Sequence, residues 1–188
     1  MRITCALCMA IIIQVPASKI ALSEEVQVRN LQILTQAEDY TVSADFNLKL
    51  NPQLVNAVES GLMLHFNLEF ELYHARWYWF NKEISKKRKI YTLSYHALSR
   101  KYRLGTGALY QTFDNLEEAV RTISHLRSWK VIEAKSINES TIYQANLILY
   151  LNIQELPKPF QINTLKNNDW DLSTGWIRWE FAIKDPDK

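Results

Sequence analysis

Apolar and polar side chains alternate strictly along much of this chain. Between Asp39 and Leu50 the alternation has no exception, and it returns from Leu62 to Leu72 and again from Thr141 to Glu155. A period of two residues is typical of a β-strand with one buried face and one solvated face. The sequence therefore predicts a mainly β fold built from antiparallel strands. Further strands are predicted over Glu25–Thr35, Trp129–Lys135 and Trp176–Ile183.

The strand that begins at Leu62 is predicted to be long and bent. Its apolar set changes phase at Tyr73, as it does across a β-bulge. A polar tip is expected over Asn81–Lys89, followed by a return strand from Tyr91 whose phase also changes, at Leu98. Strands of this length favour curvature around a sandwich or partial barrel. We therefore expect an antiparallel β-sandwich with long bent hairpins.

Two short-to-medium helices are expected to pack on or cap the sheets. The first has Asn51 as N-cap, Pro52 at its first position and Gly61 at its end. The second is predicted to begin at Asp114, with Glu117 completing a capping box. The segment Leu156–Phe160, with two prolines, is expected to be an extended break. No linker or repeat divides residues 18–188, which we expect to form a single β-rich domain.

The first 17 residues have the three parts of a secretory signal peptide. Arg2 precedes an apolar run over Ile3–Ile13, and Ala17 stands at a plausible cleavage site, with Ala21 as the alternative. The run is short for a membrane span, which needs about 20 apolar residues, so a retained anchor is the weaker interpretation. We expect a periplasmic or otherwise exported protein.

The two cysteines of the chain, Cys5 and Cys8, lie within this leader. The rest of the sequence therefore has no disulfide framework, thiolate zinc site or cysteine nucleophile. A net charge of +2 provides no general attraction for nucleic acid. No catalytic motif and no cofactor-binding motif is found.

The tip of the long hairpin is the most distinctive candidate contact surface. Aromatic residues lead there directly into a run of cations; the candidate residues are Trp77, Tyr78, Trp79, Lys82, Lys86, Lys87, Arg88 and Lys89. Such a strip could sit on an anionic membrane surface or hold an acidic partner. The alternative is a hairpin with core tryptophans, whose lysines keep the tip soluble and block edge pairing.

Two further groups are weighed against simpler interpretations. His74 and His96 could face each other across the hairpin near Glu69 or Glu71, but no third metal ligand is fixed by spacing, so no metal site is predicted. The two glutamates are expected opposite Arg100, Lys101 or Arg103. Charge pairing between strands explains them more simply than the paired acids of a sugar-cleaving enzyme.

Four stretches together resemble a bacterial family catalogued as domain of unknown function 4390. They are Gly61-Leu62 before the long strand ending in Arg76-Trp77, Tyr95–Leu104, Phe113–Ala119 leading to Trp129, and Leu156-Pro157-Lys158-Pro159 with Trp170 and Ser173. The resemblance implies an exported protein of Gram-negative bacteria whose gene tends to lie near a two-component sensor kinase. It implies no activity and no catalytic residues.

The sequence thus favours a non-enzymatic envelope protein whose long hairpin or exposed edge engages a protein partner, with an accessory role in sensory signalling as the sharper version. The alternatives are an apolar or lipid ligand held between the sheets, and membrane-surface association through the Trp77–Lys89 tip. A filled core with an exposed apolar patch would favour a partner, whereas a large apolar cavity would favour a ligand.

Overall fold

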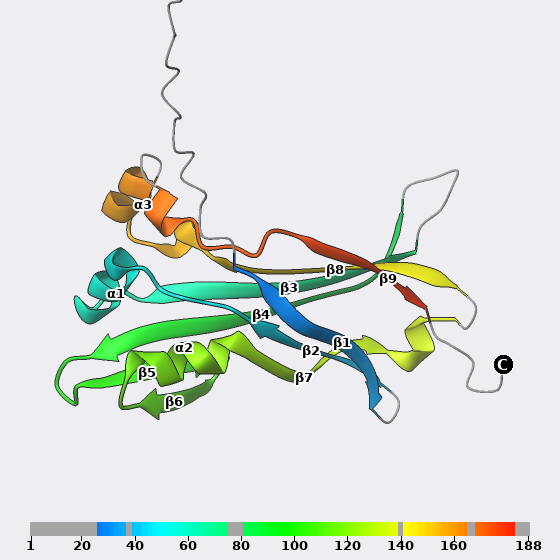
Figure 1. The fold of residues 1–188 in the computed structure, drawn as a ribbon, viewed down its shortest axis with the longest axis horizontal. Helices are drawn as coiled ribbons and strands as arrows, with labels where there is room; N and C mark the ends of the chain where they lie inside the picture. Colours follow the sequence, from blue (N-terminus) through cyan, green and yellow to red (C-terminus); the bar gives the residue numbers. More distant parts are fainter. Residues whose placement is uncertain (1–25, 37–38, 75–80, 139–140, 165–167, 183–188) are drawn as a thin grey trace, which may run out of the picture.

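A computed structural model describes residues 26–36, 39–74, 81–138, 141–164 and 168–182. It has two antiparallel sheets, as the alternation predicted (Figure 1). The smaller sheet has the order β1-β2-β7 and the larger has the order β6-β5-β4-β3-β8-β9. The strands are β1 Val28–Gln36, β2 Asp39–Phe46, β3 Leu64–His74, β4 Lys82–His96, β5 Lys101–Thr106, β6 Leu109–Phe113, β7 His125–Glu133, β8 Ile142–Leu151 and β9 Ile177–Ala182.

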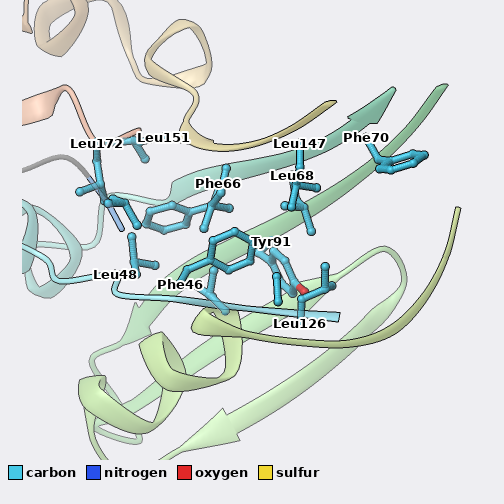
Figure 2. Packing of buried hydrophobic residues seen from close by; sticks show 14 of the residues in the cluster. Phe46, Leu48, Phe66, Leu68, Phe70, Tyr91, Leu126, Leu147, Leu151 and Leu172 are labelled. Carbon is cyan, nitrogen blue, oxygen red and sulfur yellow. The ribbon is translucent and has the colours of Figure 1, made fainter. Parts of the chain in front are cut away.

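The layer between the two sheets is filled with apolar side chains. Alternate residues of β3, among them Phe66, Leu68 and Phe70, are completely buried on the inner face of the larger sheet. Figure 2 shows Phe66 and Leu68 on the side of β3 that faces Phe46 of β2 and Leu126 of β7. The mainly β sandwich with helices on its sheets is therefore confirmed, and its interior is packed.

The bulge predicted at Tyr73 is confirmed, because the pairing of β3 with β4 shifts register between Leu72 and Tyr73. The predicted polar tip over Asn81–Lys89 is wrong. β4 already begins at Lys82, and Lys86 and Lys89 lie opposite Glu71 and Leu68 in the ladder. The run of cations hid this strand because its alternation involves charged residues on both faces.

The second predicted phase shift is a turn between two strands and not a bulge. β4 ends at His96 and β5 begins at Lys101, with Arg100 in the left-handed region at φ 52°. Leu98 lies in this turn with 94% of its side chain exposed. Because Leu98 is apolar, the sequence pattern wrongly indicated that the strand continues through this turn.

Helix α1 (Pro52–Glu59) is capped as predicted: the Asn51 side chain accepts a hydrogen bond from the Leu54 N–H, and Gly61 follows at φ 92°. Helix α2 (Leu116–Ser124) is capped by Asn115, one residue later than predicted, because Asp114 pairs with Lys101 instead.

A third helix, α3 (Lys158–Thr164), occupies the segment predicted as an extended break. Pro159 lies in its first turn, where a missing N–H leaves no hydrogen bond unmade. Three short 3₁₀ helices complete the fold: η1 Ala134–Ser136, η2 Ile153–Glu155 and η3 Asn168–Trp170. None of the helices in the described part of the chain has the length and apolar character needed to cross a membrane. The predicted signal peptide, and Trp77, Tyr78 and Trp79, lie outside the described residues.

Candidate functional site: a free edge strand beside a basic pocket

Strand β6 forms one edge of the larger sheet. A two-residue loop joins it to β5, with Gly107 at φ 60° in the first position, as a type II′ turn requires. Thr106 and Leu109 are the pair that closes this hairpin. Because an antiparallel ladder hydrogen-bonds alternate residues, Tyr110 and Thr112 direct their backbone N–H and C=O groups away from β5.

The other sheet edges carry protection that β6 lacks. β1 has a register irregularity between Arg29 and Gln32, β9 carries Arg178 and Glu180, and the Val131 carbonyl of β7 accepts a hydrogen bond from Ser85. Charges, bulges and covering groups are the usual means of preventing an edge from pairing with another chain. β6 reads Leu-Tyr-Gln-Thr-Phe, without a charge, and pairs with β5 over all five residues without a shift.

The two apolar residues at the start of β6 are well exposed: 77% of Leu109 and 71% of Tyr110. The Tyr110 ring covers Gly105 of β5, where an added Cβ would lie 3.0 Å from the ring. Leu109 instead shares the inner face of the sheet with Leu104 and Gln111. Sequence reasoning missed β6 because a short strand exposed along most of its length shows no alternation of buried and solvated positions.

An open pocket of about 330 Å³ adjoins β6 on the inner face of the sheet. Its lining comes from β4, β5, β6, α2 and β7, and comprises Lys89, Tyr91, Leu104, Thr106, Leu109, Gln111, Thr122, His125 and Arg127. Its basic side chains are Lys89, His125 and Arg127, and no Asp or Glu is among the lining residues. The pocket therefore combines apolar walls with a positive rim.

Lys89 is the unusual residue of this pocket. Because it lies opposite Leu68, its side chain is on the inner face of the sheet, half-buried, with its Nζ atom 5.3 Å from the centre of the Tyr91 ring. Burial lowers the pKa of Lys89 and raises that of the Tyr91 hydroxyl to about 12. Within the described residues, Lys89 has no carboxylate partner.

The other two basic residues reach the pocket from β7. Arg127 is held by Asp45, with 2.5 Å between Nη2 and Oδ1, and by the Ala44 and Leu126 carbonyls. Hydrogen bonds from Asn30 and Arg127 keep the pKa of Asp45 below its usual value. His125 Nδ1 lies 2.8 Å from the Arg121 carbonyl oxygen. Arg127 is therefore neutralised and fixed, whereas Lys89 is not.

A wider groove of about 650 Å³ lies on the other side of His125, between α2 and the segment Phe46–Leu50. Its apolar floor includes Val55 and Val120, and its charged side chains are Lys49, Arg121 and Glu117, next to His125. The groove is open to solvent and lies over a filled core. A filled core beneath an open groove favours a partner surface over a large enclosed ligand cavity.

The outer face of the larger sheet holds two buried carboxylates. Glu69 pairs with Arg88 at 2.9 Å and accepts a hydrogen bond from the Tyr150 hydroxyl at 2.8 Å. Glu71 pairs with Lys86 at 2.6 Å and accepts a hydrogen bond from the Tyr73 hydroxyl. Their partners thus come from β4 and not, as predicted, from Arg100, Lys101 or Arg103.

This cluster has the character of a structural ladder. Burial opposes the ionised form of Glu71, but hydrogen bonds from Lys86 and Tyr73 outweigh that effect and hold the pKa of Glu71 below 4.5. Glu71 therefore holds no proton near neutral pH with which to act as a general acid. Among the described residues, the buried Oδ1 atoms of Asn67 and Asn146 have no hydrogen-bond partner.

The lowered pKa of Glu71 predicts acid sensitivity. The unfolded carboxyl titrates near 4.5, so the Glu71 contribution to the free energy of unfolding is complete above that pH and is lost as the pH falls through the lower, folded value. Urea unfolding between pH 6 and pH 3 should show a steeper loss of stability for the wild type than for Glu71→Gln. Equal slopes would contradict this interpretation.

The remaining predicted candidates are separated. Lys82 lies opposite His74, and Lys87 lies opposite Phe70 on the same face as Lys89. The prediction that His74 and His96 face each other is wrong: His74 packs against Tyr143, and His96 lies opposite Lys101 and bonds with Ser99. Within the described ranges, no three His, Cys, Asp or Glu side chains are grouped as metal ligands.

Comparison with known proteins identifies one family. The model of the family described as Domain of unknown function (DUF4390) matches residues 23–180, which is most of the chain. No curated protein and no solved structure matches.

Proposed function

The chain belongs to the family described as Domain of unknown function (DUF4390), and from its geometry we propose that it is a non-enzymatic binding protein of the cell envelope. In this proposal, the edge of β6 takes an extended segment of a protein partner as an additional strand. The observation that carries the proposal is the uncharged, regular and exposed edge of β6. Export by the N-terminal leader and a role beside a sensory system are parts of the same proposal.

Strand addition matches the features of β6. The outward backbone groups of Tyr110 and Thr112 would pair with the partner's main chain, and the exposed Tyr110 side chain would pack against it. The layer between the sheets is filled with side chains, and the exposed apolar residues lie on the surface, which supports the same proposal. An edge with these properties would otherwise be a site of aggregation, so a natural occupant explains why it persists.

The charges beside β6 indicate the chemistry of the partner. Arg103, on the neighbouring strand opposite Thr112, is exposed and has no ion-pair partner within the described residues. We therefore propose that the partner segment combines apolar residues with acidic ones, since an acidic group complements the positive charge of Arg103.

The proposal is tested by photocrosslinking in the organism that encodes the protein. A photoreactive amino acid replaces Tyr110 in one strain and Arg178, exposed on β9 at the opposite edge of the same sheet, in a control strain. We expect a discrete protein adduct in the envelope fraction from position 110 and none of that mass from position 178. Equal adducts from both positions, or none from position 110, would contradict it.

A further inference from the structure

The positive charge of Lys89 is only partly compensated, and the proposed partner contact does not involve this residue. Its ammonium group is partly removed from water, on a sheet face whose neighbouring positions Leu68 and Tyr91 are buried. Burying a cation is unfavourable unless an opposite charge compensates it. The Tyr91 ring compensates in part, because its face attracts a cation at this distance. No carboxylate within the described residues completes the compensation.

The surroundings of Lys89 lack competing negative charge. The other ionisable groups that line the pocket are His125 and Arg127 from β7 and Tyr91 from β4, whose hydroxyl stays protonated with its pKa raised to about 12. The nearby carboxylate of Asp45 is not part of the lining and interacts with the two other basic residues: its Oδ1 is 2.5 Å from Arg127 Nη2 and 4.0 Å from His125 Nε2. The pocket can therefore accept one negative charge at Lys89 without repulsion from its own walls.

Tyr91 adds a second donor. Its side chain is 4% exposed and lines the pocket, and its hydroxyl has no hydrogen-bond partner in the described part of the protein. Figure 2 shows the ring extending from the larger sheet toward Leu126 of β7. A tyrosine hydroxyl can donate a hydrogen bond, so the place of Tyr91 among the lining residues of the pocket is suited to binding a ligand oxygen.

The rest of the wall is apolar. Leu104 is buried beneath the pocket, and Leu109 borders it from the edge strand. The volume of about 330 Å³ lies at the lower end of the range for small-molecule sites, which is roughly 300–1,000 Å³. A single anionic group attached to a short apolar body fits this combination, and a multiply charged anion such as a nucleotide does not.

From these observations we infer that the pocket binds a small amphipathic monocarboxylate, with the carboxylate at the Lys89 ammonium and the Tyr91 hydroxyl and the acyl chain along Leu104 and Leu109. This ligand site is distinct from the outward edge of β6. It needs no protein partner and can be tested on the purified protein alone.

The test compares three ligands that share one chain length. Octanoate, octanol and octylammonium are titrated below their micellar concentrations into ¹⁵N-labelled protein, and the amide signals of Leu104, Thr106 and Leu109 report binding. We expect saturable binding of octanoate. Octanol should bind at least about tenfold more weakly than octanoate, since a charge-assisted contact is lost. Octylammonium should leave these signals unchanged. Equal affinity for octanoate and octanol would overturn the inference.

Matched substitutions locate the site. Lys89→Met should weaken octanoate binding about tenfold or more, whereas Lys87→Met removes an exposed lysine from the same face of the same strand and should leave the dissociation constant unchanged. Tyr91→Phe should weaken it severalfold by removing one hydrogen bond. Unchanged binding by Lys89→Met, or equal weakening by Lys87→Met, would overturn the assignment.

One further arm separates a free carboxylate from an acidic side chain of the partner. Excess octanoate added during the Tyr110 crosslinking experiment should leave the adduct unchanged if the pocket serves a free ligand. Loss of the adduct would instead place a carboxylate of the partner in the pocket and overturn the assignment to a separate ligand.

Discussion

Phe66→Ala is expected to lower the free energy of unfolding by about 3–5 kcal/mol. The Phe66 side chain is completely buried between the sheets, between the β4 and β8 positions Tyr91 and Leu151 in the ladder. Removing its ring leaves a cavity in the layer where both sheets meet, and surrounding residues held in strands can close it only partly. Chemical denaturation monitored by circular dichroism measures the change.

Phe160→Ala is the matched control, because it removes the same atoms from a residue of α3 that is 38% exposed. Its ring lies 6.1 Å from that of Trp170, so we expect a loss of about 1 kcal/mol. Comparable losses for the two variants would mean that the layer around Phe66 is not the main source of stability.

Glu69→Ala is expected to cost about 1–3 kcal/mol. The carboxylate is 7% exposed and receives both Arg88 and the Tyr150 hydroxyl, which in turn accepts a hydrogen bond from Asn67. Its removal leaves the half-buried Tyr150 hydroxyl without its acceptor. Arg88 stays hydrated, because 54% of its side chain is exposed, and this keeps the cost below that of a fully buried ion pair.

Glu180→Ala is the control for this second prediction. Glu180 is an exposed glutamate on β9 of the same sheet, opposite Gln144, and its removal should change stability by less than about 0.5 kcal/mol. If urea unfolding shows the same stability for Glu69→Ala as for Glu180→Ala, the outer-face ladder makes no measurable contribution to the free energy of unfolding.

The strands that bury one face could be predicted from the sequence because burial on one side leaves a record in the alternation itself. β2, β3 and β8 were located in this way, and so was the bulge beside Tyr73. Local capping chemistry likewise identified α1 through Asn51 and Gly61. These signals need no information from outside the segment that carries them.

The errors arose where the deciding partner lies elsewhere in the chain. In the sequence, Lys86 and Arg88 resemble a solvated tip because the glutamates that form ion pairs with them are on β3. The burial of Lys89 follows from its register against Leu68, which the charge run alone does not reveal. The same limitation affected the site, since the pocket joins residues of five elements and β6 shows no periodic signal of its own.

The measurement that bears most directly on partner binding at β6 is the adduct from position 110 in a Thr112→Pro background. Proline at this outward-facing position removes one edge donor and places a ring there, while the ladder with β5 is left intact. If a partner adds a strand to β6, the adduct should fall to background while the melting temperature stays within a few degrees. An adduct of undiminished yield in a folded Thr112→Pro variant would contradict strand addition at this edge.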